Sequence, residues 1–132
     1  VGGQLLRDTE HKLYLLYAQG NWVEITPGTP YTIIGATGYG KPVLDRTFHY
    51  TDTLQHALKV GCLAFDSTRI SAADVDFPID VVVYRRGSFH LIEKRYNKED
   101  LQSLTGWWAD RLRQSIQQIP EDAIRGVFDE SH

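Results

Sequence analysis

The sequence predicts an α+β fold, because two groups of strand-like segments are each followed by helix-like segments. Runs of aromatic and β-branched residues joined by short turns are typical of antiparallel hairpins, whereas apolar residues spaced by three and four are typical of helices. The order is strands, helices, strands, helix, which differs from the alternation of a doubly wound parallel sheet. With 132 residues and no repeat or linker-like segment, we expect one domain over residues 1–132.

The first strands form a predicted antiparallel meander. Residues 13–18 (LYLLYA) and 22–26 (WVEIT) are strand-like runs on either side of a short loop around Gly20, which is typical of a hairpin. Residues 27–30 (PGTP) predict the next turn, and residues 31–35 (YTIIG) predict a third strand.

The next predicted element is a helix over residues 53–71. Apolar residues recur there at helical spacing, and Thr51, Asp52 or Thr53 is the expected N-cap. Cys62 lies on the apolar stripe of this helix. We therefore expect Cys62 to be a small buried hydrophobe and not a nucleophile.

A second hairpin and a final helix complete the predicted fold. Residues 79–84 (IDVVVY) and 89–94 (FHLIEK) flank a turn at residues 85–88, and the nearly all-apolar first strand favours a central position in a sheet. Residues 101–119 predict the last helix, which Pro120 ends. The expected apolar stripe of this helix consists of Leu101, Leu104, Trp108, Leu112, Ser115 and Ile119.

Composition restricts the classes of partner and compartment. A net charge of -3 gives no electrostatic reason to expect a nucleic acid or an anionic membrane as partner. No segment approaches the roughly 18 apolar residues of a membrane helix, and the single cysteine favours a reducing compartment, here the cytoplasm. The histidines show no metal-ligand spacing, so we expect neither a metal nor another cofactor.

The beginning of the sequence resembles the inside of a strand more than a translation start. It reads VGGQLL, and the sequence contains no methionine. We expect the chain to be a piece of a longer protein. A trimmed or processed start of a complete small protein is the alternative.

Residues 35–41 come close to the pattern of a phosphate-binding loop. Gly35, Gly40 and Lys41 have the G-x-x-x-x-G-K spacing, but Pro42 stands where such a loop needs the hydroxyl of serine or threonine. Phosphate binding therefore stays only as an alternative. We interpret the stretch as a glycine turn before a helix whose first residue is Pro42, and Lys41 as a solvated charge or a subunit contact.

Asp66 is the main candidate for chemistry. We expect it near the end of the predicted helix, where the helix dipole disfavours a carboxylate by about 0.3–1 kcal/mol. One interpretation is that Asp66 faces a cleft and binds an amine, with Ser67 or Ser71 completing the hydrogen-bond network. The other is a solvated helix end at which Asp66 pairs with Arg69.

Three segments taken together resemble the bacterial proteasome-type peptidases called Anbu, the ancestral β-subunit family: LYLLYAQGNWVEITPGTPYTIIGATGYGKPVLDR, LAFDSTRIS and PIDVVVY. The similarity spans roughly residues 1–119 and implies that the chain is the C-terminal portion of a subunit whose N-terminal portion is missing. The resemblance also implies the N-terminal-nucleophile hydrolase fold, in which two antiparallel sheets pack face to face between helices (an αββα sandwich). Such subunits form homo-oligomeric rings or spirals.

The resemblance implies a threonine peptidase that acts on peptide or protein substrates without a cofactor. Its nucleophile is an N-terminal threonine whose free α-amine acts as the base. Val1 has no hydroxyl, so the chain as written does not supply this nucleophile.

Two supporting positions of the family match residues of this chain. The family's glycine-serine-glycine turn is similar to residues 38–40, with Tyr39 in place of the serine. The family's aspartate at the end of the following helix has Asp66 as its nearest match. Because an arginine takes the place of the serine that follows in the family, the substitutes for it are Ser67 and Ser71.

We therefore expect the chain to be part of a proteasome-like threonine peptidase subunit that hydrolyses peptide bonds. The alternative is a non-catalytic assembly module that forms subunit contacts. Trp22, Trp107 and Trp108 motivate this alternative, because tryptophan is enriched at protein interfaces.

Overall fold

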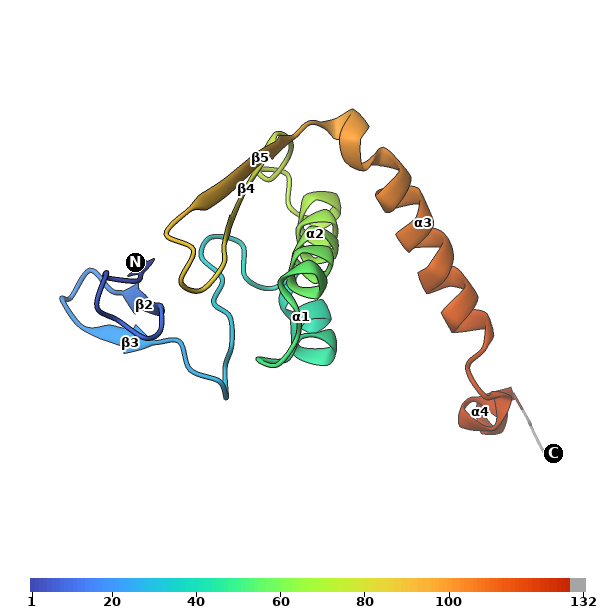
Figure 1. Ribbon diagram of the computed structural model, residues 1–132. Helices are drawn as coiled ribbons and strands as arrows, with labels where there is room; N and C mark the ends of the chain where they lie inside the picture. Colours follow the sequence, from blue (N-terminus) through green and yellow to red (C-terminus); the bar gives the residue numbers. More distant parts are fainter. Residues whose placement is uncertain (129–132) are drawn as a thin grey trace.

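The computed structural model describes residues 1–128 and confirms an α+β fold with two small antiparallel sheets (Figure 1). The strands of the first sheet are β1 (Gly2–Gly3), β2 (Lys12–Leu16) and β3 (Trp22–Glu24), and those of the second are β4 (Ile79–Tyr84) and β5 (Leu91–Tyr96). The helices are α1 (Lys41–Thr47), α2 (Leu54–Ser71), α3 (Lys98–Gln117), η1 (Glu121–Ala123) and α4 (Arg125–Phe128).

The first predicted hairpin is confirmed, although its strands are shorter than expected. In β2 and β3, Tyr14 pairs with Glu24 and Leu16 pairs with Trp22. The rings of Tyr14 and Trp22 meet edge to face, with centroids 5.3 Å apart. This cross-strand aromatic contact stabilises the hairpin register.

The predicted third strand over residues 31–35 is wrong. Among the described residues, no strand pairs with this segment. Its β-branched side chains favour an extended backbone, but a strand needs a hydrogen-bonded neighbour. The extended run also ends at Gly35, whose φ of +88° lies in the left-handed region.

The predicted long helix is confirmed as α2. Thr53 is its N-cap, and its side-chain oxygen accepts a hydrogen bond of 3.1 Å from the backbone N–H of His56. The shorter helix α1 packs beside α2 (Figure 1). It begins at Lys41, so Pro42 is the second helical residue and not the first as predicted.

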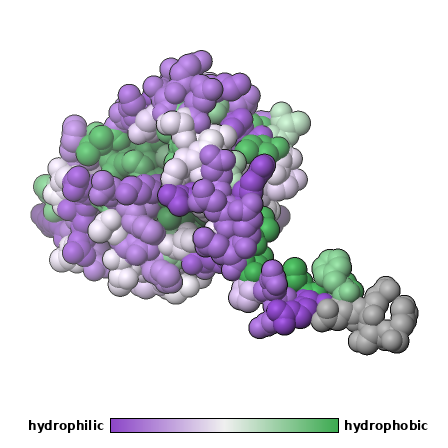
Figure 2. Space-filling view, turned by 90° about the vertical axis from the view of Figure 1, so that its right-hand side faces the viewer, coloured by the Kyte–Doolittle hydropathy of each residue, from purple (hydrophilic) through white to green (hydrophobic). Residues whose placement is uncertain are grey.

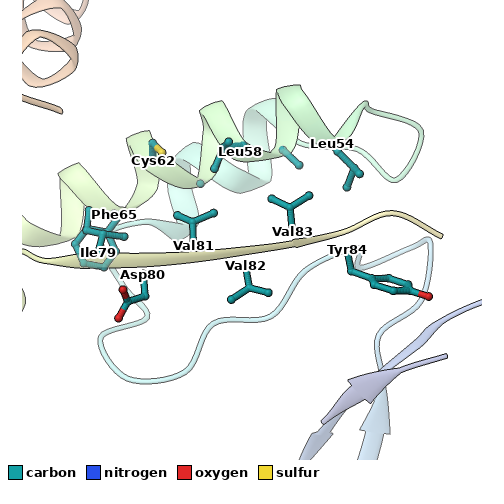
Figure 3. Close-up of a pocket in the computed structure, with 12 residues that line it drawn as sticks. Leu54, Leu58, Cys62, Phe65, Ile79, Asp80, Val81, Val82, Val83 and Tyr84 are labelled. Carbon is teal, nitrogen blue, oxygen red and sulfur yellow. The ribbon is translucent and has the colours of Figure 1, made fainter. Parts of the chain in front are cut away.

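The second hairpin is also confirmed, with β4 as predicted and β5 starting two residues later than predicted. The connection is longer because Ser88 and His90 hydrogen-bond to each other and Phe89 adopts a positive φ of 49°. Along β4, Val81 and Val83 point towards α2, whereas Val82 points away from it (Figure 3).

Helix α3 begins three residues before the predicted start, because Asn97 and Asp100 form a capping box there. The C-terminal part of its predicted apolar stripe is exposed in this chain: Leu112 is 45% exposed and Ile119, just beyond the helix, is 50% exposed. Figure 1 shows the reason, since α3 extends away from α2. Within residues 1–128, the buried apolar residues are Val60, Ala64 and Ala72.

Gln4 joins the two sheets. Its Oε1 accepts hydrogen bonds from the Tyr84 phenol (2.7 Å) and the Gly87 backbone N–H (2.8 Å). Its Nε2 donates to the carbonyl of Asp8 at 2.9 Å. One side chain therefore fixes the loop after β1 to the end of β4.

On the face of the molecule shown in Figure 2, apolar residues are interspersed among polar ones. Large exposed apolar side chains occur on several elements, including Trp22 at 60%, Val82 at 57% and Ile116 at 66%. None of the helices in residues 1–128 is long and apolar enough to cross a membrane.

Candidate functional site

The glycine turn at residues 38–40 lies directly on α2. Gly40 is buried, and a Cβ atom added to it would lie 3.0 Å from the carbonyl oxygen of Ala64 and 3.1 Å from its Cβ. These distances are shorter than most Cβ contacts in proteins, so the turn or α2 would have to shift to admit a side chain at residue 40. Gly38, in contrast, has no heavy atom within 4 Å of an added Cβ.

An open hollow of about 510 Å³ lies beside this turn. Its wall is formed by the extended segment at residues 31–36, by α1 and by one side of α2. Most of the lining is apolar. The polar side chains that line it from α2 and the loop after it are Thr68 and Asp74.

Asp66 lies on α2 against α3 and is only 6% exposed. Its Oδ1 accepts a hydrogen bond of 2.6 Å from the Thr105 hydroxyl and one of 3.0 Å from Nη2 of Arg69. The guanidinium of Arg69 also lies over the ring of Phe77, at 5.3 Å from the centroid. Asp66 Oδ2 and Arg69 Nε are buried without a hydrogen-bond partner among the described residues.

The predicted pairing of Asp66 with Arg69 is therefore observed, but the predicted solvated helix end is wrong. Asp66 precedes the last residue of α2, Ser71, by more than one turn, and the neighbouring α3 covers it. Its carboxylate connects two helices.

The structure does not bring all of the predicted site residues together. A helix turns by about 100° per residue, so Asp66 lies about 200° around α2 from Ala64, which contacts the glycine turn. Ser67 and Ser71, in contrast, lie within about 60° of Ala64. Tyr39, in the turn itself, is 47% exposed.

The two serines differ in their surroundings. Ser67 is half-buried, and its hydroxyl donates to the carbonyl of Leu63 at 2.9 Å. Ser71 is exposed at the last turn of α2. Of the two, Ser71 has the hydroxyl that is more accessible to a bound molecule.

Two residues of this region are missed by the sequence analysis. Thr68 is 9% exposed and donates to the carbonyl of Ala64 at 2.8 Å, and Asp74 is exposed in the loop after α2. Thr68 follows Ala64 by four residues, so helical spacing alone indicates that the two lie on the same side of the helix. Asp74 follows the helix in an irregular loop, where no periodic pattern predicts its direction.

Cys62 is half-buried, and burial raises the pKa of its thiol. Cys62 is therefore less buried than predicted, and its raised thiol pKa favours the protonated form. It lines a second open hollow of about 400 Å³ between α2 and β4, among Leu58, Val81 and Val83 (Figure 3).

Lys41 belongs to a polar cluster on α1. Its Nζ donates to Asp45 Oδ2 at 2.7 Å and to the phenol oxygen of Tyr31 at 3.3 Å, and the Tyr31 hydroxyl donates to Asp45 Oδ1. The hydrogen bond to Asp45 raises the pKa of Lys41, and the hydrogen bond to Lys41 lowers the pKa of Asp45. Lys41 and Asp45 therefore stabilise each other in their charged forms.

The histidines are engaged in local contacts. His56 Nε2 lies 2.8 Å from the carbonyl oxygen of Thr47, and the backbone N–H of His49 donates to Asp52 at 2.7 Å. In the part of the chain that the structure describes, no group of three His, Cys, Asp or Glu residues could hold a metal ion.

The two adjacent tryptophans of α3 differ in exposure. Trp108 is half-buried, whereas Trp107 is 49% exposed and lies 5.8 Å from the guanidinium of Arg111. Their rings are stacked, with centroids 6.2 Å apart. Trp107 therefore presents aromatic surface to solvent in this chain.

Neither a protein-family model nor a curated protein sequence matches the chain. Solved structures do. A Gly-1 mutant of Anbu from Hyphomicrobium sp. strain MC1 is 40% identical with a TM-score of 0.87, over 91% of this chain and 52% of that chain. The Anbu complex from Pseudomonas aeruginosa, described as a helical assembly, is 34% identical with a TM-score of 0.86, over 90% and 50%.

Anbu (ancestral beta-subunit) from Yersinia bercovieri is 33% identical with a TM-score of 0.85, over 90% of this chain and 51% of that chain. The chain thus spans about half the length of the Anbu structures that it matches. Agreement in both sequence and backbone extends over about nine-tenths of the chain. Over the half of those chains that it spans, this chain is similar to the Anbu (ancestral beta-subunit) structures in both sequence and fold.

Proposed function

We propose that the chain is part of a proteasome-type threonine peptidase subunit that hydrolyses peptide bonds in the cytoplasm. The observation that carries this proposal is the similarity to Anbu, at 33–40% identity over about nine-tenths of the chain. The nucleophile would belong to the part of the subunit that lies outside this chain, which spans about half the length of the Anbu structures that it matches. The single cysteine supports a reducing compartment.

We propose that the glycine turn and the α2 side that faces it support the nucleophile. Tyr39 would provide a hydroxyl from the turn, and Ser67 and Ser71 hydroxyls from the helix. Asp74 would be the carboxylate closest to the chemistry, because it lines the same hollow as the turn. Asp66, already bonded to Thr105 and Arg69, would act by holding α2 in place.

Peptide hydrolysis by the natural full-length subunit separates the two carboxylates. Asp74→Asn is expected to lower kcat about a hundredfold or more without changing the melting temperature, as is typical when a group that assists proton transfer is removed. Asp66→Asn is expected to lower the melting temperature first. Unchanged turnover by Asp74→Asn would exclude Asp74 from a role in proton transfer. If the unaltered subunit hydrolysed no peptide, that result would argue against the proposed peptidase activity.

We also propose that the natural subunit forms a homo-oligomer and that the exposed apolar side chains of α3 take part in its contacts. Leu112 is 45% exposed and Ile116 66%, and because they lie one turn apart on α3 they share one exposed apolar surface. Sedimentation velocity of the natural protein is expected to show a species much larger than the subunit. The Ile116→Lys variant is expected to form a smaller species than the unaltered protein. A stable monomer at tens of micromolar would contradict this proposal.

A further inference from the structure

The loop at residues 72–78 connects α2 to β4 and carries Asp74, which lines the hollow beside the glycine turn. The start of the loop is fixed to the helix, because the backbone N–H of Ala72 donates to the carbonyl of Thr68 at 2.8 Å. The backbone N–H of Val75 donates to the carbonyl of Ala72 at 3.3 Å, which places Asp74 within a turn. The direction of Asp74 therefore follows from how this loop lies on α2.

Phe77 is the residue at which the end of the loop meets α2. Its ring is half-buried, and the guanidinium carbon of Arg69 lies 5.3 Å from the ring centroid. An aromatic face attracts a cation at this distance. The contact joins the last turn of α2 to a residue two positions before β4.

Arg69 is itself held on its other side. Its Nη2 donates to Asp66 Oδ1 at 3.0 Å, and the hydroxyl of Thr105 on α3 donates to the same oxygen at 2.6 Å. The side chains of Asp66 and Arg69 are only 7% and 18% exposed. Since residues 1–128 already bury both side chains, these contacts do not depend on the part of the subunit outside the chain.

The geometry of the ion pair indicates that Phe77 takes part in orienting Arg69. A guanidinium and a carboxylate pair most strongly through two parallel hydrogen bonds. Here Nη2 alone donates to Asp66, whereas Arg69 Nε and Asp66 Oδ2 are buried without a partner among the described residues. Arg69 thus makes one hydrogen bond where two are possible, while its guanidinium lies over the ring.

We propose that Arg69 is a positioning residue that, through Phe77, fixes the loop at residues 72–78 and so keeps Asp74 at the hollow. The step from this placement to catalysis rests on the proposed function, in which Asp74 assists proton transfer. The placement itself does not, because its contacts are present whether or not peptides are hydrolysed.

Hydrogen exchange in the natural full-length subunit tests the placement, because the exchange rate of a loop reports its local opening. Phe77→Leu removes the aromatic face and leaves the ion pair of α2 intact. Exchange in a peptide covering residues 72–78 is expected to accelerate roughly three- to tenfold in this variant. Phe77→Tyr keeps an aromatic face and is expected to exchange like the unaltered protein.

Phe89→Leu is the matched control, since Phe89 is 52% exposed between β4 and β5. It is expected to leave exchange at residues 72–78 unchanged. Exchange at residues 79–84 of β4 is the internal reference for global unfolding.

Arg69→Met extends the test to the arginine itself. This variant also lowers global stability, because it leaves Asp66 without its ion-pair partner, so its exchange is normalised to that of β4. If Arg69 acts through Phe77, adding Phe77→Leu to Arg69→Met is expected to cause no further acceleration at residues 72–78.

Turnover tests the step from placement to catalysis. Phe77→Leu is expected to lower kcat roughly three- to tenfold. This loss is expected to vanish in the Asp74→Asn background, because the group that the loop positions has then been removed.

The placement is overturned if Phe77→Leu and Phe89→Leu exchange alike at residues 72–78, or if β4 accelerates as much as the loop. Additive effects of Phe77→Leu and Arg69→Met would overturn it as well, as would loss of the original rate in Phe77→Tyr. In an active subunit, an unchanged kcat for Phe77→Leu would overturn the step to catalysis. If the subunit hydrolyses no peptide but shows the expected exchange, the proposed function fails and the placement of the loop is supported.

Discussion

Replacing Asp66 with alanine is expected to destabilise the protein by about 3 kcal/mol, because removal of one partner leaves a largely buried charge without compensation. The side chains of Asp66 and Arg69 are only 7% and 18% exposed. Thr105 would lose its acceptor at the same time, so α3 would lose a hydrogen bond to α2. Urea titration is expected to show the loss as a lower unfolding midpoint.

Asp110→Ala is the matched control, because Asp110 is an exposed carboxylate on α3. It is expected to change the free energy of unfolding by less than about 0.5 kcal/mol. Equal midpoints for Asp66→Ala and Asp110→Ala would show that the buried pair contributes no stability. Proteolysis within α3 is a second readout, expected to accelerate only in Asp66→Ala.

Replacing Gly40 with alanine is expected to destabilise the protein by about 1–3 kcal/mol, through overpacking. The new Cβ would lie 3.0 Å from the Ala64 carbonyl oxygen, a backbone atom that cannot move without distorting α2. The Thr68 hydroxyl donates to the same oxygen. The glycine turn is therefore expected to move away from the helix.

Gly38→Ala separates this steric effect from a general effect of the substitution. Gly38 lies in the same turn, and nothing lies within 4 Å of its added Cβ. Thermal unfolding of the two variants is expected to show a lower midpoint for Gly40→Ala alone. Equal losses would mean that backbone freedom, and not the contact with Ala64, explains why glycine is needed at residue 40.

The elements that local signals determine were predicted well. Helix α2 has both its cap at Thr53 and its apolar spacing in the sequence, and β4 is an apolar run interrupted only by Asp80. The third strand failed because a strand depends on a neighbour, which residues 31–35 lack in this chain. The start of α3 was missed because the capping box of Asn97 and Asp100 precedes the first apolar residue of the helix.

The candidate site was predicted only in part, for a geometric reason. The sequence places Asp66 within the right helix, but its direction depends on which side of α2 the glycine turn and α3 occupy. Gly40 takes the side of Ala64, and Thr105 takes the side of Asp66. Asp74 becomes a candidate only once the loop after α2 is folded against the hollow.

The bond between Gln4 and Tyr84 has a consequence for the order of events during synthesis. The two residues are 80 positions apart, so the side chain of Gln4 is made long before either of its donors. Contacts between such distant residues form late and slow the folding of a chain. During synthesis, the loop after β1 therefore cannot form these hydrogen bonds until the β4–β5 turn has emerged from the ribosome.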